Sequence, residues 1–215
     1  MKDFILKSKT KSRRALILVD LQNDFVPGGA LAVSDALAVI GIANRLMSNF
    51  DLVVATQDWH PADHQSFASQ HTNLSVGHQF VLNGLPQTAW PDHCIQNTFG
   101  AELVKNLNHN GIDHVVRKGM DRSVDSYSGF FDNGHVHSTG LAELLRKDQI
   151  DSIAVMGLAT DYCVRFTAID GAEQGFKTAL ILDGCRGVEL QKGDIAKAIA
   201  EMVQRGIEIS DSESV

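Results

Sequence analysis

The stretch Arg14-Ala-Leu-Ile-Leu-Val-Asp20 contains five consecutive apolar residues between two charged ones. Strands with one face in water alternate apolar and polar residues, whereas an uninterrupted apolar run of this length indicates a strand that is buried on both faces. Strands of that kind occur in parallel sheets that helices cover on both sides. This segment therefore predicts an inner strand of an α/β protein.

Short apolar runs alternate with amphipathic stretches along the rest of the chain. Further strands are expected at residues 51–56, 112–117, 150–156, 177–183 and 207–210. Helices are expected at residues 34–50, 102–110, 138–147, 161–174 and 194–204. Ser34, Asp35 and Ser138 offer N-caps for two of these helices, and Gly111 and Gly175 are typical of helix ends.

This alternation has no internal repeat and no Pro/Ser-rich linker. It predicts a single-domain, three-layer α/β/α fold around a central, mostly parallel sheet of about six strands. We place the domain at residues 14–211, after an N-terminal extension of residues 1–13.

The composition excludes several classes of protein. Of the 215 residues, 44% are apolar and 21% are charged, as in ordinary globular proteins. The net charge of −7 argues against nucleic acid or an anionic membrane as the main partner, and no apolar segment reaches transmembrane length. Three cysteines without a C-x-x-C pair are too few for a disulfide framework, which predicts a reducing, cytoplasmic location.

The segment 57–99 interrupts the alternation, because no regular element can be recognised in it. It holds five of the nine histidines, namely His60, His64, His71, His78 and His93. Irregular segments of this length in compact domains are usually functional loops. We therefore expect binding residues in this segment.

Polar residues follow the expected strands at the edge where ligands of parallel sheets bind. Asp20 ends the first strand, Lys118 ends the third, and Cys163 begins the helix after the fourth. A helix N-terminus and a nearby ammonium both favour the thiolate, and a carboxylate can accept the thiol proton. The alternatives are a small buried Cys163 at a helix–sheet contact, a surface cation at Lys118 and a capping role for Asp20.

A metal site is the second candidate. Asp58 and His60 are two residues apart at a strand end, where both side chains point the same way. His93 is the candidate third ligand, and three protein ligands leave positions open for water or substrate. The alternative is a set of ordinary histidines in a polar loop. Three further residues are weaker candidate ligands: Asp63, His64 and Cys94.

Five motifs carry a resemblance that spans residues 15–209. They are Val19-Asp20-Leu-Gln-Asn-Asp-Phe25, Gln57-Asp58-Trp-His60, Trp90-Pro-Asp-His93-Cys94, Arg117-Lys118-Gly119 and Gly157-Leu-Ala-Thr-Asp-Tyr-Cys163. In this order and spacing they resemble nicotinamidases of the isochorismatase-like cysteine hydrolase superfamily, in particular the bacterial pyrazinamidase/nicotinamidase type. Each motif alone is a weak signal, whereas the ordered set is specific.

The resemblance implies roles for individual residues. The implied catalytic triad is Asp20, Lys118 and Cys163. The implied ligands of one divalent metal ion, usually zinc and in some relatives iron or manganese, are Asp58, His60 and His93. A cis peptide at Leu158–Ala159 is implied as well, with the N–H groups of Ala159 and Cys163 as an oxyanion hole. The ring pocket is implied to be lined by Phe25, Trp90 and Tyr127.

The activity that the resemblance implies is hydrolysis of nicotinamide to nicotinate and ammonia through a cysteine thioester, a step in NAD salvage, with pyrazinamide as a further substrate. The metal ion is implied to anchor the pyridine nitrogen, and a homo-oligomer is compatible with the resemblance. Rival interpretations are a related hydrolase acting on another small amide and a non-catalytic metal- or ligand-binding protein. A vinyl-ether hydrolase such as isochorismatase is disfavoured, because that reaction needs no thiol.

Overall fold

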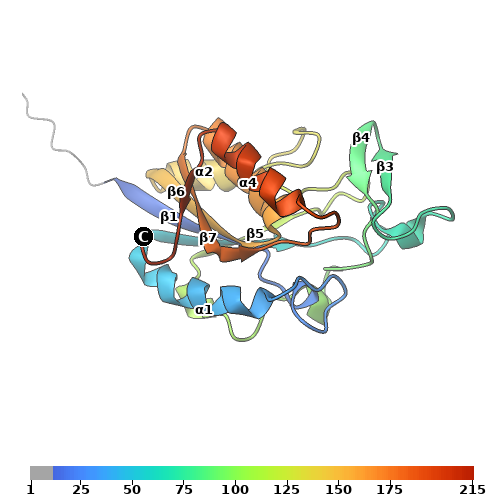
Figure 1. The fold of residues 1–215 in the computed structure, drawn as a ribbon, viewed down its shortest axis with the longest axis horizontal. Coiled ribbons are helices and arrows are strands. Elements are labelled where there is room, and N and C mark those ends of the chain that lie inside the picture. Colours follow the sequence, from blue (N-terminus) through green and yellow to red (C-terminus); the bar gives the residue numbers. More distant parts are fainter. Residues whose placement is uncertain (1–11) are drawn as a thin grey trace, which may run out of the picture.

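Six parallel strands form the central sheet of the computed structural model, which describes residues 12–215 (Figure 1). The strands are β1 (Arg13–Val19), β2 (Leu52–Asp58), β5 (His114–Lys118), β6 (Ile150–Leu158), β7 (Lys177–Arg186) and β8 (Glu208–Ser210). Their order across the sheet is β5-β2-β1-β6-β7-β8, and every neighbouring pair is parallel. The predicted α/β class and the number of strands are confirmed.

Strand β1 lies inside the sheet, with β2 on one side and β6 on the other. Its residues from Ala15 to Val19 are fully buried, as the uninterrupted apolar run predicts. Burial of each Leu, Ile or Val side chain contributes about 1.5–3 kcal/mol, so this strand is a main part of the core. The predicted extension falls mostly outside the described residues, and Arg13 already belongs to β1.

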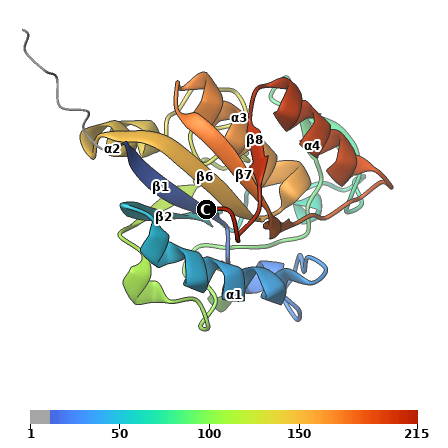
Figure 2. The same cartoon turned by 60° about the vertical axis from the view of Figure 1, so that its left-hand side comes forward.

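Four α-helices among residues 12–215 cover the two faces of the sheet. They are α1 (Ala36–Leu46), α2 (Leu141–Lys147), α3 (Arg165–Glu173) and α4 (Asp194–Gln204). Figure 2 shows α1 on one face and the other three helices on the opposite face, which is the predicted three-layer arrangement. None of these described helices is both long and apolar enough to span a membrane.

Two predicted N-caps do not act as caps. Helix α1 begins after Asp35, whose side chain makes no capping hydrogen bond and instead lies 2.8 Å from the Arg186 guanidinium. Helix α2 begins only at Leu141, after Gly140 in a left-handed conformation, rather than at Ser138. The prediction was therefore correct for these two helices and wrong for the residues that cap them.

The predicted helix at residues 102–110 is wrong. The segment is irregular, with one isolated β-bridge at Leu103 and a 3₁₀ turn only at its end, His109–Gly111. Its backbone pairs instead with the segment after β1, because Asn23 N–H donates to Glu102 O and Val104 N–H donates to Leu21 O. These tertiary hydrogen bonds replace the i→i−4 bonds that a helix would make.

The segment 57–99 contains a hairpin that was not predicted. Strands β3 (Gln79–Leu82) and β4 (Leu85–Thr88) pair antiparallel and stand apart from the central sheet in Figure 1. Asn83 and Gly84 join them, with positive φ angles of 49° and 85°. Asn-Gly is the preferred sequence of a two-residue turn with positive φ at both positions, so this dipeptide was the signal that could have revealed the hairpin.

Candidate active site

Polar side chains from four neighbouring strands meet at the carboxyl edge of the sheet. Asp20 follows β1, Asp58 ends β2, Lys118 ends β5, and Cys163 lies in a π-helical turn after β6, Thr160–Val164. All four side chains are buried. Adjacent parallel strands end at the same edge, so the structure brings together the three residues that the sequence analysis grouped as a triad.

The Lys118 ammonium is the centre of this cluster. Its Nζ lies 2.9 Å from Asp20 Oδ2 and 2.6 Å from Asp58 Oδ1, and 3.3 Å from Cys163 Sγ. It also donates to the backbone oxygen of Ser126 at 2.9 Å. Burial by itself disfavours the charged ammonium, but the two carboxylates outweigh it and raise the pKa of Lys118 well above 10.5. The ammonium therefore stays charged.

The Cys163 thiol differs from the sequence-based expectation. Burial raises its pKa well above 9.0, and the carboxylates of Asp20 and Asp58 raise it further, while Lys118 opposes them. Cys163 lies in the π-helical turn that leads directly into α3, so the predicted position near a helix start is correct, but burial and the carboxylates set the direction of the pKa shift. The side chain is consequently a thiol whose proton must be removed when the sulfur attacks an electrophile.

Asp20 is placed to remove that proton. Its Oδ1 accepts a hydrogen bond from Thr56 Oγ1 at 2.5 Å, which fixes the orientation of the carboxylate. Its Oδ2 forms no well-aligned hydrogen bond within residues 12–215, although Lys118 Nζ lies nearby. Burial raises the pKa of Asp20 above 3.8, with the Lys118 charge opposing. A carboxylate with a free lone pair and a raised pKa is a suitable general base for a thiol.

The predicted cis peptide at Leu158–Ala159 is present. The backbone oxygen of Ala159 accepts hydrogen bonds from Tyr162 N–H at 3.0 Å and Val164 N–H at 3.1 Å, which holds the π-helical turn. The N–H of Ala159 has no acceptor within the described part of the chain. Ala159 and Cys163 both line the same pocket, so this N–H is available to an oxygen atom of a ligand.

Asp58, His60 and His93 form a compact group of metal-ligand type. Their ligand atoms lie within 4.8 Å of one another, and all three residues are buried. Asp58 Oδ2 is 3.6 Å from His60 Nε2 and 3.9 Å from His93 Nε2. Asp58 Oδ1 faces Lys118, which leaves Oδ2 for an ion.

The hydrogen bonds at the Nδ1 atoms of His60 and His93 determine which ring nitrogen can face a metal ion. His60 Nδ1 lies 2.9 Å from Gly119 O, and His93 Nδ1 lies 2.7 Å from Pro91 O. A carbonyl oxygen only accepts, so each Nδ1 carries a proton and each Nε2 is the nitrogen that faces Asp58. Burial lowers the pKa of His60, but Asp58 outweighs it and raises this pKa above 6.5, so an ion must displace a proton from His60 Nε2. Burial lowers the pKa of His93 to about 4, which keeps this ring neutral. The residues present therefore fit a divalent ion.

The weaker candidate ligands lie in different surroundings. Asp63 pairs with Arg122 at 2.9 Å at the surface. His64 Nδ1 contacts Ser66 Oγ at 2.7 Å, although the His64 ring lies next to His60, with ring centroids 4.4 Å apart. The structure thus separates Asp63 from the metal group and places His64 beside it.

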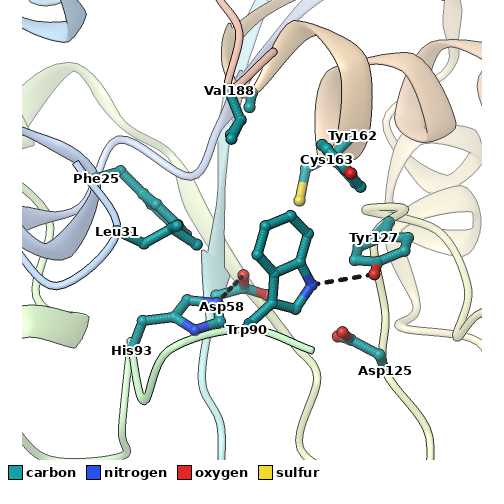
Figure 3. A pocket seen from close by; sticks show the side chains of 11 residues that line it. Phe25, Leu31, Asp58, Trp90, His93, Asp125, Tyr127, Tyr162, Cys163 and Val188 are labelled. Carbon is teal, nitrogen blue, oxygen red and sulfur yellow. Dashed lines mark hydrogen bonds and ion pairs between the residues drawn. The ribbon is translucent and has the colours of Figure 1, made fainter. Parts of the chain in front are cut away.

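A small pocket lies next to Cys163 and the metal group. Figure 3 shows the Cys163 sulfur, the Trp90 indole and the phenyl ring of Phe25 around this space. The three predicted pocket residues, Phe25, Trp90 and Tyr127, all line it. The pocket is mostly apolar and aromatic, with the thiol at one end and the Asp58–His93 pair at another, which suits a flat ring that carries a carbonyl group.

Sequence reasoning missed four lining residues: Leu31, Asp125, Tyr162 and Val188. Val188 reaches the pocket because the Asp161 carboxylate accepts hydrogen bonds from Val188 N–H at 2.9 Å and from Glu189 N–H at 2.8 Å. Tyr162 packs edge-on against Trp90, with ring centroids 4.8 Å apart. Tyr162 lies inside a motif that the sequence analysis quoted, whereas no sequence pattern marks Val188.

Comparisons with known proteins identify the family of this chain. The isochorismatase domain family matches residues 14–214. The nicotinamidase of Escherichia coli K12 is 52% identical over 197 residues, which are 90% of this chain and 92% of that protein.

Solved structures show the same fold. The Acinetobacter baumanii nicotinamidase/pyrazinamidase superposes with a TM-score of 0.92 at 42% identity and covers 96% of this chain and 99% of its own. The Pyrococcus horikoshii pyrazinamidase, which was solved in complex with zinc, has a TM-score of 0.76 at 35% identity and covers 93% of this chain and 99% of its own.

Proposed function

The chain belongs to the isochorismatase family, and we propose that it hydrolyses nicotinamide to nicotinate and ammonia. It is a nicotinamidase, as its 52% identity with the E. coli enzyme over most of both chains supports. The structural observation that carries the proposal is the buried contact of Lys118 with Asp20 and Cys163, at the end of an aromatic pocket.

The side chains of this cluster suit a two-step thioester mechanism. Cys163 Sγ attacks the carboxamide carbon while Asp20 Oδ2 takes the thiol proton. The N–H groups of Ala159 and Cys163 donate to the oxyanion, and each such donor is worth about 3 kcal/mol in comparable sites. Asp20 then returns the proton to the amide nitrogen, so that ammonia leaves and a thioester remains. Asp20 next activates a water molecule, which attacks the thioester and releases nicotinate and the thiol.

The role of Lys118 in this mechanism is electrostatic. Its ammonium faces Asp20, Asp58 and the Cys163 sulfur at hydrogen-bonding distances. It opposes the two carboxylates, which would otherwise disfavour any negative charge on the sulfur. Because the ammonium is already in place, no reorganisation is needed when that charge develops.

We assign the metal site to Asp58, His60 and His93, with zinc as the ion. The zinc-bound pyrazinamidase of P. horikoshii supports this choice. One carboxylate and two imidazoles also suit iron and manganese, so the donor set alone does not select the metal. When bound, a divalent ion supplies a Lewis-acidic contact for the ring nitrogen of the substrate. Two of the ligands, Asp58 and His93, line the pocket, so we assign the ion the role of orienting the ring toward Cys163.

The aromatic pocket extends the proposal to pyrazinamide, which shares the carboxamide and a ring nitrogen with nicotinamide. The relatives named for both activities support this extension. We further assign the catalytic domain to residues 14–211 and the enzyme to the cytoplasm, since all three cysteines are free thiols in the structure.

The test is ammonia release by the purified protein from nicotinamide, pyrazinamide, benzamide and an N-carbamoyl amino acid. Nicotinate is identified separately by chromatography. The proposal predicts turnover of the two ring-nitrogen amides and slower turnover of benzamide. Hydrolysis of the carbamoyl compound in preference to nicotinamide would instead identify a related amidohydrolase, and the absence of ammonia from every amide would reject the enzymatic function.

A further inference from the structure

The β3–β4 hairpin contributes a buried polar side chain to the neighbourhood of the ring pocket. Gln87 lies on β4 opposite Phe80 of β3 and is only 3% exposed. It is not among the residues that line the pocket, and neither the sequence motifs nor the proposed mechanism uses it. A buried amide without a packing role is costly unless its hydrogen bonds are made, so its partners are informative.

Two of the three hydrogen-bond partners of Gln87 are residues of the pocket wall. Its Nε2 donates to Asp125 Oδ2 at 2.9 Å and to Tyr127 Oη at 3.0 Å. It also lies 2.9 Å from the backbone oxygen of Thr88. Asp125 and Tyr127 belong to the loop after β5, far from the hairpin in sequence. One side-chain amide therefore joins the hairpin to that loop.

Tyr127 links Gln87 to the indole of Trp90. Trp90 Nε1 donates to Tyr127 Oη at 3.1 Å, and Figure 3 shows this bond beside the Cys163 sulfur. The Tyr127 oxygen thus receives hydrogen bonds from both Gln87 and Trp90. Two donors on one hydroxyl fix its position, and a fixed hydroxyl holds the indole plane at the pocket.

Asp125 would be left with an unpaired oxygen without Gln87. Its Oδ1 accepts from Ser126 N–H at 2.7 Å, whereas its Oδ2 accepts from Gln87. A hydrogen bond to a buried carboxylate is worth more than a neutral one, and its loss displaces the groups around it. Both branches from Gln87 therefore end in residues that line the ring pocket.

We propose that Gln87 is a positioning residue that holds the Trp90 wall of the ring pocket through Tyr127 and Asp125. The inference rests on the proposed hydrolysis of nicotinamide and deepens it, because it assigns recognition of the aromatic ring to the hairpin. Gln87 has no hydrogen bond to Asp20, Lys118 or Cys163 within residues 12–215. Its removal therefore weakens ring binding and leaves the reaction of the thiol intact.

Three variants test this role. Gln87→Leu removes the amide, and Gln87→Glu keeps the shape but replaces the donor by a carboxylate next to Asp125. Gln79→Leu is the matched control, because Gln79 lies on the same hairpin and its side chain donates, within residues 12–215, only to Thr88 Oγ1, at 2.9 Å. Steady-state kinetics on nicotinamide separate KM from kcat. The fluorescence emission of Trp90, measured in a Trp59→Phe background, reports the surroundings of the indole.

We expect KM for nicotinamide to rise about tenfold in Gln87→Leu and more in Gln87→Glu, while kcat changes less than about threefold. We expect Trp90 emission to shift in both, and Gln79→Leu to match the wild type. An unchanged KM with unchanged Trp90 emission would overturn the inference. An equal rise in KM for Gln79→Leu would also overturn it, because the hairpin as a whole would then be responsible.

The outcomes separate this inference from the proposed function. A wild-type protein that releases no ammonia from nicotinamide contradicts the proposed function, and the Trp90 emission of the three variants then decides the positioning role by itself. If Gln87→Leu does not fold, the isosteric Gln87→Glu variant supplies the same comparison. Loss of kcat without a change in KM in that variant would contradict a role in ring binding.

Discussion

Replacement of Lys118 by methionine removes a buried cation and leaves two buried carboxylates. Its Nζ lies 2.9 Å from Asp20 Oδ2 and 2.6 Å from Asp58 Oδ1. At an effective dielectric constant of about 20, each attraction amounts to about 6 kcal/mol before the cost of desolvating the charges. Desolvation offsets most of this sum, and removal of one partner from a buried ion pair typically costs about 3–5 kcal/mol. We expect a loss of that size in the free energy of unfolding of Lys118→Met near neutral pH.

The loss should depend on pH in a defined direction. Burial already raises the pKa of Asp20 above 3.8, and Lys118 opposes that shift. In Lys118→Met the pKa of Asp20 therefore rises further, whereas in the unfolded chain the carboxyl titrates near 3.8. Between these two values the folded variant binds a proton that the unfolded chain has released, so its stability decreases as pH rises through the raised pKa. The cost of the substitution should thus be smaller at about pH 5 than at about pH 7.5.

The assay is urea unfolding of chelator-treated wild type and Lys118→Met at both pH values. Lys197→Met is the control, because the only ion pair of Lys197 in the described part of the chain is with Asp194, at 3.2 Å, and 72% of its side chain is exposed. That variant should match the wild type at either pH. Iodoacetamide should also alkylate Cys163 more slowly in Lys118→Met, since Lys118 opposes the rise in the pKa of the thiol. Equal stability of Lys118→Met and wild type at both pH values would refute the conclusion that the Lys118 ammonium stabilises the buried carboxylates of Asp20 and Asp58.

The remaining predictions concern the nucleophile, the metal group and the general base. Cys163→Ala should lower kcat at least about a thousandfold, while equilibrium dialysis still detects nicotinamide binding. The control Cys185→Ser should stay active, and substantial turnover by Cys163→Ala would exclude a thioester. Removal of the metal by a chelator, verified by elemental analysis, should raise KM for nicotinamide far more than KM for benzamide, which lacks the ring nitrogen. An equal rise in KM for both amides would argue against anchoring of the ring by the ion. Thr56→Val should lower kcat about tenfold because Asp20 Oδ1 loses its hydroxyl donor, and Thr56→Ser should restore kcat. A wild-type kcat in Thr56→Val would contradict the role of Thr56 in orienting Asp20.

The sheet and its polar edge were predictable because they depend on chain-wide patterns. The apolar run at 15–19 indicated a strand buried on both faces, and the structure has that strand inside a parallel sheet. Once the strands are parallel, the residues after them must meet at one edge. The placement of Asp20, Lys118 and Cys163 at one edge therefore follows from the parallel topology, whereas their contact also depends on the strand order β5-β2-β1-β6, which the sequence pattern does not give.

The errors lie where tertiary contacts override local preference. Residues 102–110 have a helical pattern, but the hydrogen bond from Val104 N–H to Leu21 O, and that from Asn23 N–H to Glu102 O, draw the segment against the chain after β1. The β3–β4 hairpin was missed for the opposite reason. Its strands have only four residues each, and the Asn83-Gly84 turn was a local signal in a segment read as irregular.

The direction of the thiol pKa shift was also beyond sequence reasoning. A helix N-terminus and a lysine both favour thiolate, and each can be found in a sequence. The opposing effects are burial of Cys163 and the second carboxylate, Asp58, whose distance from the sulfur depends on the assembled sheet. Only the three-dimensional balance indicates a resting thiol, and this is the reason why we assign removal of its proton to Asp20.

The reacting groups and the walls of the ring pocket come from different kinds of segment. The reacting groups lie on strand ends and are fixed by the sheet, whereas the walls of the ring pocket come from loops that hydrogen bonds hold in place. Asp161 holds Val188 in this way, and Gln87 holds Tyr127. A change in these loop contacts moves a pocket wall without displacing the thiol from its base. Substitutions in the loops should therefore alter which amides bind, whereas substitutions at the strand ends should abolish hydrolysis of all of them.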